Sequence, residues 1–519
     1  MLERSNLADL PLAQLKIKSL NELAADAENL RHNGLRVVLA HGTFDLLHLG
    51  HVRYFEEARQ QGDLLFVTIT ADGFVNKGPS RPYFPHDLRA EMVAALSCVD
   101  GVAVNYAASA VNVIEAIRPD VYVKGPDYRD ASSDVTGKIV EEQRAVETCG
   151  GRIFFTDNIT FSSSTLINRF LEIPNPELRG YLDSARQRDF NRRIPALIEQ
   201  IAGMKVLMVG ETIVDEYVYV SPLGKPPKEN VLASIRRGQE IFAGGVIAAA
   251  NHVANFCAEV EVFTCLGEKD SYEQLLRESL MPNIRLWSAT RPNSPTVRKT
   301  RYVESDYLRK LFEVYTMDDT PLSGSLNAQV VEEIERRARD FDVVIVTDFG
   351  HGMLTPEIRS ALLANSRFLA LNVQSNAGNF GYNLVTKYPR ADYVCLDAPE
   401  ARLAISAKDA DLDRVATEAL RERIAVDRII LTHGRNGCVT FEPGQGVTHV
   451  PAFTRRVVDT MGAGDAFLAV TAPLAAVSDD MDMIGFIGNA VGAIKVGIVG
   501  HRKPVEKAPV LKFIQTLLK

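Results

Sequence analysis

A short strand-to-helix transition early in the chain places the firmest limit on its fold. The apolar run Leu35–Ala40 lies between Gly34 and Gly42, as expected of a buried parallel strand. A helical pattern begins near Leu49, with apolar residues at helical spacing. The residues between them are small or polar, and open α/β sheets bind ligands at the carboxyl ends of their strands. This stretch therefore predicts an α/β fold with a site at the first strand–helix junction.

Two histidines, His48 and His51, stand three residues apart where that helix begins. Two histidines at this spacing are in most chains surface residues or satisfied core residues. Here Gly42 allows close approach of a ligand, Thr43 and Asp45 add polar groups, and a helix N-terminus offers free N–H groups. We therefore interpret the junction as a phosphate site.

The junction resembles the GxFD…HxGH signature of the cytidylyltransferase-like nucleotidyltransferases. The GTFD segment comprises Gly42, Thr43, Phe44 and Asp45, and HLGH runs from His48 to His51. The resemblance implies that both histidines stabilise the α-phosphate of a nucleoside triphosphate while another phosphate attacks it. Charge that develops on phosphoryl oxygens requires positioned donors of this kind.

Composition excludes several classes of protein. The chain has 519 residues, 46% of them hydrophobic, which is enough for two or three domains. Its 58 basic and 66 acidic residues form no long block of one sign, so we expect no nucleic-acid or membrane partner. The six cysteines lack CxxC spacing, and no apolar run reaches membrane-spanning length. We expect a cytoplasmic protein without a disulfide framework or a zinc site.

Strands and helices alternate along the first part of the chain, which predicts a doubly wound parallel sheet. Polar clusters follow these strands: Lys77 in NKGPSRP, Arg89 on the next helix, the KGPDY segment, and the hydroxyls of FSSSTLI. Further strands are expected at Leu64–Thr70, Val99–Val104, Val121–Val123 and Arg152–Thr156.

Taken in order, these segments resemble the adenylyltransferase module of bifunctional ADP-heptose synthases, over Lys16–Leu171. Pro126 replaces a glycine of that family's KGGDY segment. The resemblance implies two catalytic histidines and a catalytic Lys77. It also implies nucleotide- and substrate-binding roles for Gly42, Thr43, Phe44, Asp45, Arg89, Lys124, Gly125, Asp127, Tyr128, Ser164 and Thr165.

A proline-containing, charged helical stretch separates two halves of the chain. We expect a first domain at residues 1–171, a helical linker at 172–203 and a second domain at 204–519. In the second half, Glu216–Ile241 predicts a small strand lid, and Gly244-Gly245 leads into a helix of small residues. Strands are expected at Lys205–Val209, Val343–Val346, Leu369–Val373, Tyr393–Leu396 and Arg428–Leu431.

The DTMGAGD segment, Asp459–Asp465, is the sharpest motif of the second half. The backbone of Gly462, Ala463 and Gly464 can converge at a helix N-terminus to form an anion hole for a transferring phosphoryl group. Asp465 can then take the proton of an attacking hydroxyl, as a kinase base does.

This half resembles the ribokinase-like PfkB sugar kinases, over Lys205–Lys519; no Walker A sequence is present. The resemblance implies a ribokinase-like domain with a small β lid, in which Asp215 contacts a sugar hydroxyl and Glu400 is associated with metal. It implies further ligand-binding roles for Gly244, Gly245, Asn251, Thr432, Gly434 and Gly437.

The kinase half departs from that pattern at four places: Glu211, Ala248, Asp397 and the segment Asn372–Gln374. We therefore do not expect the sugar site to be that of the family, although Asp465 and its anion hole are intact.

The chain as a whole resembles a bifunctional ADP-heptose synthase with its modules in reversed order. The resemblance implies Mg²⁺-dependent phosphorylation of a heptose 7-phosphate-like sugar by ATP, then nucleotidyl transfer to the sugar 1-phosphate. Two alternatives stay open. The kinase-like half could only bind ligand or dimerise, and the first half could use CTP and a polyol phosphate. The expected partners are a sugar phosphate and a nucleoside triphosphate, and we expect a homo-oligomer.

Overall fold

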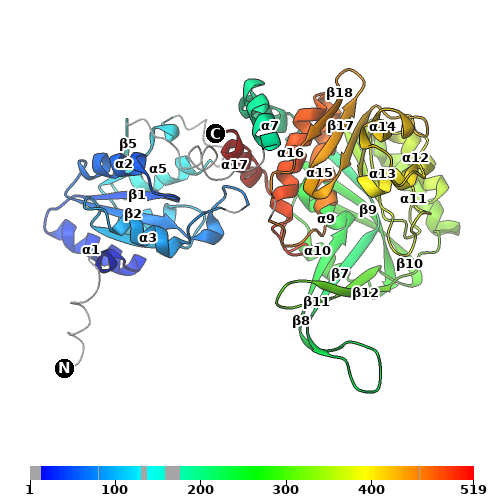
Figure 1. Ribbon diagram of the computed structural model, residues 1–519, viewed down its shortest axis with the longest axis horizontal. Coiled ribbons are helices and arrows are strands. Elements are labelled where there is room, and N and C mark those ends of the chain that lie inside the picture. Colours follow the sequence, from blue (N-terminus) through cyan, green and yellow to red (C-terminus); the bar gives the residue numbers. More distant parts are fainter. Residues whose placement is uncertain (1–12, 80, 130–136, 158–175, 455) are drawn as a thin grey trace. The chain divides into compact units, whose positions relative to one another are not determined.

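The computed structural model describes residues 13–79, 81–129, 137–157, 176–454 and 456–519 (Figure 1). The chain divides into two compact units, Met1–Pro176 with Leu511–Lys519, and Glu177–Val510. The segment expected to be a linker contains α7 (Pro176–Gln187) and α8 (Phe190–Gln200). Because α8 buries Phe190 and Ile194 and packs on the helices of the second unit, it belongs to that unit's core.

The first unit is a five-stranded parallel sheet in the order β3-β2-β1-β4-β5. Along β1, Val38 packs in a cluster with Phe55, and Leu39 packs in another with Leu23, so both faces of the sheet are covered. This confirms the doubly wound fold. The strands are β1 (Val37–Gly42), β2 (Leu64–Thr70), β3 (Gly101–Asn105), β4 (Val121–Lys124) and β5 (Arg152–Phe155).

The strand order reverses between β1 and β4, and ligands of doubly wound sheets bind at such a switch point, beyond the carboxyl ends of the strands. The GTFD segment follows β1, and Gly125 follows β4. The fold therefore brings the two segments to one edge of the sheet. The helices are α1 (Leu20–His32), α2 (Leu49–Arg59), α3 (His86–Ala94), α4 (Val111–Ile117) and α5 (Lys138–Thr148), with 3-10 turns η2 (Asp72–Phe74) and η3 (Pro126–Tyr128).

The second unit is built on a nine-stranded sheet, β10-β9-β6-β13-β14-β15-β16-β17-β18, in which only the β16–β17 and β17–β18 pairs are antiparallel. Helices α9, α15 and α16 cover one face and α11 to α13 the other (Figure 1). The strands are β6 (Lys205–Gly210), β9 (Glu259–Lys269), β10 (Ile284–Pro295), β13 (Val343–Asp348), β14 (Leu369–Val373), β15 (Tyr393–Asp397), β16 (Arg428–Thr432), β17 (Cys438–Glu442) and β18 (Gly446–Val450).

The helices of this unit follow its strands, as in other doubly wound folds. They are α9 (Val246–Val253), α10 (Glu273–Ser279), α11 (Gly324–Arg337), α12 (Pro356–Asn365), α13 (Ala398–Ala404), α14 (Leu412–Arg414), α15 (Ala463–Val477), α16 (Met481–Lys495) and α17 (Lys507–Leu518), the last of which continues into residues grouped with the first unit.

A separate four-stranded sheet, β12-β11-β7-β8, forms the lid that the sequence predicts. Its strands are β7 (Thr212–Gly224), β8 (Ala233–Gly245), β11 (Arg298–Glu304) and β12 (Lys310–Thr316). The β7–β8 hairpin extends well beyond the rest of the lid (Figure 1). Throughout the described ranges, no helix is long and apolar enough to cross a membrane.

Candidate active sites

The GTFD segment forms a tight loop at the carboxyl end of β1. Phe44 has a left-handed φ of 46°, which is uncommon for an aromatic residue and marks local strain. Its ring lies about 3.0 Å from where a Cβ on Gly42 would be, so a side chain there would displace it. The buried Asp45 carboxylate accepts the N–H of Tyr83 at 2.9 Å. Asp45 thus ties this loop to the segment that follows Lys77.

The two histidines meet at the start of α2. His48 caps the helix, because its Nδ1 accepts the N–H of Gly50 at 3.0 Å. The His51 ring stacks on it with centroids 4.0 Å apart. Burial lowers the pKa of His48, and burial with the charges of His48 and Lys77 lowers the pKa of His51 to about 3. Both imidazoles are therefore neutral at pH 7, and an adjacent phosphate would favour their protonation.

Lys77 adds a cation beside this pair. Burial lowers its pKa to about 8, against the opposing effect of Asp45. Arg81 pairs with Asp45 at 3.7 Å. The structure thus brings Lys77, His48 and His51 to one place, where a chain of phosphates would meet one ammonium and two imidazoles.

Arg89 lies beneath the motif rather than on its surface. Its side chain is fully buried and donates to the carbonyls of Thr43, Phe84 and Thr70, and to Asp72. With four of its five donors in use, the guanidinium acts on the site by holding the Thr43 carbonyl.

Lys124 is also buried, at the end of β4. Its Nζ lies 2.7 Å from the Glu142 carboxylate and over the rings of Tyr122 and Tyr128. The sequence places Lys124 in the binding pocket, but within this structure its charge is already balanced by Glu142. Gly125 leads into η3, which carries Asp127 and Tyr128. Ser164 and Thr165 lie outside the described residues.

In the second unit, Asp215 of β7 lies between the Arg301 guanidinium and the His501 imidazole, whose Nε2 is 3.2 Å away. Burial opposes ionisation, but the hydrogen bond from His501 and the charge of Arg301 hold the pKa of Asp215 well below its usual range. A Cβ on Gly244 would lie 2.0 Å from this carboxylate, so glycine is required there. Gly245, at φ 58°, begins α9 beside it. The expected sugar contact is therefore enclosed by the Arg301 guanidinium and the His501 imidazole.

Glu211, one of the departures noted in the sequence, has a structural partner. Its carboxylate accepts the N–H of Phe349 at 3.0 Å and of His351 at 3.1 Å. Burial, with a contribution from Asp348, raises its pKa from 4.5 to about 7. A glutamate at this position thus holds the turn after β13.

The DTMGAGD motif forms the turn into α15. Gly462 is its N-cap at φ 69°, and a Cβ there would lie 2.5 Å from the His501 ring. Asp465 lies in the first turn with Ala463 and Gly464, where helix N–H groups favour an anion. Its Oδ1 accepts a hydrogen bond from Gln374 at 2.8 Å, and burial raises its pKa. Asp465 therefore lies where the sequence predicts a base, in the first turn of the helix that the expected anion hole begins.

Glu400, expected near the metal, lies in the first turn of α13. Its carboxylate accepts the N–H of Ser375 and of Asp397, each at 3.2 Å. Burial, together with the charges of Asp397 and Asp465, raises its pKa to about 7. A divalent cation would relieve this repulsion, so the residues fit one, although the described residues contain no cluster of three or more metal-binding side chains.

The remaining expected residues lie in different places. Thr432 ends β16, and Gly434 and Gly437 flank the following turn, at the same sheet edge as Glu400. Asn251 does not join Asp215. Its amide instead donates to the carbonyl of Ser279, the last residue of α10, at 3.0 Å.

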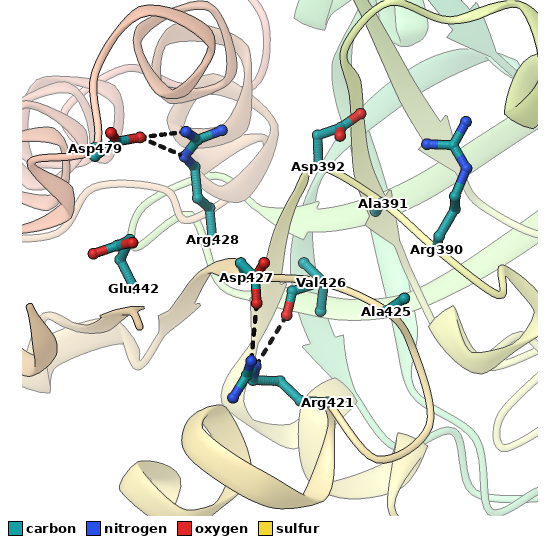
Figure 2. A pocket seen from close by; sticks show the side chains of 10 residues that line it. All are labelled: Arg390, Ala391, Asp392, Arg421, Ala425, Val426, Asp427, Arg428, Glu442 and Asp479. Atoms are coloured by element: carbon teal, nitrogen blue, oxygen red, sulfur yellow. Dashed lines mark hydrogen bonds and ion pairs between the residues drawn. The ribbon is translucent and has the colours of Figure 1, made fainter. Parts of the chain in front are cut away.

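A cavity of about 620 Å³ lies at the opposite edge of this sheet (Figure 2). It is lined by residues at the amino ends of β15 and β16. Figure 2 shows two of its three arginines directed to nearby carboxylates, Arg428 to Asp479 and Arg421 to Asp427, and the third, Arg390, donates to the Leu363 carbonyl. Since these charges are satisfied and the position is remote from the carboxyl ends of the strands, we do not assign the chemistry to this cavity.

Comparison with known proteins identifies both domains. The Cytidylyltransferase-like family model matches residues 39–170, and the pfkB family carbohydrate kinase model matches 359–508. The bifunctional protein HldE of Syntrophotalea carbinolica is 39% identical over 160 residues, 30% of this chain and 31% of that protein. The HldE of Pelobacter propionicus is 26% identical over 315 residues, 60% of this chain and 63% of that protein. A putative ribokinase from Agrobacterium tumefaciens aligns with 60% of this chain and 98% of its own, at 18% identity and a TM-score of 0.47.

The chain therefore carries the two domains of a transferase, one nucleotidyltransferase-like and one carbohydrate kinase-like. Their order is the reverse of that in HldE, and the matches span about one third to two thirds of the HldE proteins' length. The resemblance found in the sequence is thus confirmed at the level of the two domains.

Sequence reasoning did not select Arg301, His501 or Lys495 for the second site. Arg301 reaches Asp215 from another strand of the lid, and His501 reaches it from near the chain end. No local spacing signals such contacts. Gln374 was visible as a departure from the family pattern, but its hydrogen bond to Asp465 was not.

Proposed function

We propose that this chain makes a nucleotide-activated sugar in two successive steps. The second unit transfers the γ-phosphoryl group of ATP to the anomeric hydroxyl of a heptose 7-phosphate-like sugar. The first unit then transfers a nucleotidyl group, adenylyl in our proposal, to the 1-phosphate of the resulting sugar bisphosphate and releases pyrophosphate, while the 7-phosphate takes no part in the reaction. The observation that supports the proposal is that each unit groups side chains suited to phosphate chemistry: His48, His51 and Lys77 in the first, and the Gly462–Asp465 turn in the second.

In the kinase step, Asp465 removes the proton of the sugar hydroxyl while the hydrogen bond from Gln374 orients its carboxylate. The N–H groups at the start of α15 receive the charge that develops on the transferring phosphoryl group. Glu400 would help to hold Mg²⁺, which when bound would neutralise charge on the phosphates. The carboxylate pKa, raised by burial, makes Asp465 a stronger base than an exposed aspartate.

In the nucleotidyl step, an oxygen of the sugar 1-phosphate attacks the α-phosphorus, and the bond to the pyrophosphate oxygen breaks. His48 and His51 hydrogen-bond the α-phosphate, and Lys77 neutralises the departing pyrophosphate. No proton has to be removed from the attacking phosphate oxygen, so this site needs donors rather than a base. That requirement matches two imidazoles and an ammonium, and the buried Asp45 carboxylate acts on Lys77 as a counter-charge rather than as a base.

The test separates the two steps by supplying different sugars. Wild-type protein, Asp465→Asn and His51→Ala are each given Mg²⁺ with ATP or CTP and either sugar 7-phosphates or sugar 1-phosphates. We expect Asp465→Asn to lose ATP consumption with sugar 7-phosphate but to keep pyrophosphate release with sugar 1-phosphate, and His51→Ala to show the reverse. Unchanged sugar-dependent ATP consumption in Asp465→Asn would refute the assignment of the base.

A further inference from the structure

The ammonium of Lys495 lies buried behind the anion-binding turn of the second unit. Lys495 is the last residue of α16 and has no exposed surface. Its Nζ donates to the carbonyl of Met461 at 2.6 Å and to the carbonyl of Gly500 at 2.8 Å. Met461 directly precedes Gly462, and Gly500 directly precedes His501, so the ammonium joins the two segments that meet at the proposed site.

Asp459 holds the same two residues from their other side. Its carboxylate accepts the N–H of Met461 at 3.1 Å and the N–H of Gly500 at 2.9 Å. It also accepts the hydroxyl of Tyr217 and the ammonium of Lys310, both from the lid. Met461 and Gly500 are therefore each held twice, by a carboxylate at the N–H and by an ammonium at the carbonyl.

A lysine at this position carries a large desolvation penalty, because a buried ammonium loses its hydration. Burial lowers its pKa to about 8, while the charges of Asp459 and Asp465 oppose that effect, so Lys495 is protonated at pH 7. An apolar side chain could fill the same space without this cost. The lysine must therefore contribute its charge and its donors, not only its volume.

Backbone carbonyls near a carboxylate are the ligands that proteins offer to a monovalent cation that has lost its water. The Lys495 ammonium lies between two such carbonyls, near the Asp459 carboxylate, and its own side chain links it covalently to the protein. We propose that Lys495 is a positioning residue for phosphoryl transfer that serves as a built-in monovalent cation, fixing the Gly462–Gly464 turn and its positive potential without added K⁺ or NH₄⁺. The catalytic part of this inference rests on the proposed kinase function.

The test replaces the tethered cation by a free one. Lys495→Ala leaves the two carbonyls in place and opens room for an ammonium ion, whereas Lys495→Met fills that room and supplies no charge. Lys503→Ala, at an exposed lysine nearby, is the control for a general loss of charge. Sugar-dependent ATP consumption is measured in chloride salts of tetramethylammonium, Na⁺, K⁺ and NH₄⁺ at one ionic strength.

We expect wild type and Lys503→Ala to be indifferent to the monovalent cation. Lys495→Ala should lose about 100-fold in kcat, the scale of removing one electrostatic contact from such a site. NH₄⁺ should raise the kcat of Lys495→Ala by at least about tenfold and should leave the kcat of Lys495→Met unchanged. Equal responses of the two variants to NH₄⁺, or wild-type activity that requires K⁺ or NH₄⁺, would overturn the proposal.

Thermal unfolding gives a second measurement that needs no catalysis. Trp287 is the one tryptophan of the chain and lies in β10, so its fluorescence reports on the second unit. Without ATP or sugar, NH₄⁺ should raise the Tm of Lys495→Ala saturably, and should raise that of Lys495→Met no more than that of wild type. If wild type shows no kinase activity, the proposed function fails while this measurement still decides the role of Lys495. If neither variant folds, the cation dependence of wild-type activity decides it.

Discussion

The raised pKa of Glu211 leads to a prediction about the pH dependence of stability. The folded state holds this carboxyl at a pKa of about 7 against 4.5 when it is exposed. The folded protein therefore binds more protons than the unfolded chain between these two values, and stability falls as pH rises through that window. A shift of this size corresponds to about 3 kcal/mol in total, of which about 2.5 kcal/mol falls between about pH 5 and pH 8.

Glu211→Gln removes this titration and keeps one acceptor for the N–H groups of Phe349 and His351. The free energy of unfolding of the variant minus that of wild type should rise by about 2.5 kcal/mol between about pH 5 and pH 8. Urea unfolding followed by Trp287 fluorescence measures it in the second unit. Glu335→Gln, at an exposed glutamate of α11, is the control, with an expected change within about 0.5 kcal/mol. A stability difference for Glu211→Gln that does not change with pH would refute the reasoning.

Three further predictions concern the first unit. Arg89→Met should lower the free energy of unfolding of the first unit by about 3–5 kcal/mol, because the buried carbonyls and Asp72 lose their hydrogen-bond donor. Amide hydrogen exchange around Thr43 should then accelerate, and unchanged protection there would contradict the role of Arg89 in holding the Thr43 carbonyl. Lys124→Met should lower the free energy of unfolding by about 3 kcal/mol, because it leaves the buried Glu142 carboxylate without its cation. Adding Glu142→Gln to this variant should recover most of the lost stability. If calorimetric unfolding shows that the two losses add, Lys124 and Glu142 are not coupled. ATP binding should raise the pKa of His51 from about 3, so that the protein takes up protons when ATP binds near about pH 5. Calorimetry should then give a heat of ATP binding that depends on the ionisation enthalpy of the buffer. Equal heats in all buffers would show that the phosphates do not bind beside His51.

The parts of the fold and sites that the sequence predicts are those with a local signature. The apolar run Leu35–Ala40 and the helical pattern from Leu49 locate β1 and α2, and the DTMGAGD glycines locate the start of α15. These elements depend on neighbours in the chain, so their residue pattern is enough to locate them.

The remaining features depend on contacts between distant residues. Lys124 has the pattern of a ligand-binding residue, but Glu142 reaches it from α5 and balances its charge. Asn251 is among the expected ligand-binding residues, but its amide donates to the Ser279 carbonyl instead. The charge of a side chain is visible in the sequence, whereas the partner that neutralises it is selected by the packing of the elements.

The central claim is that two independent sites act in succession on one sugar. The most direct test is mass spectrometry of the products from heptose 7-phosphate, ATP and Mg²⁺ with Asp465→Asn alone, His51→Ala alone, and the two variants mixed. The account predicts unreacted sugar phosphate with the first, sugar bisphosphate with the second, and nucleotide-activated sugar only with wild type and the mixture. Nucleotide sugar from Asp465→Asn alone, or no sugar bisphosphate from His51→Ala, would contradict it.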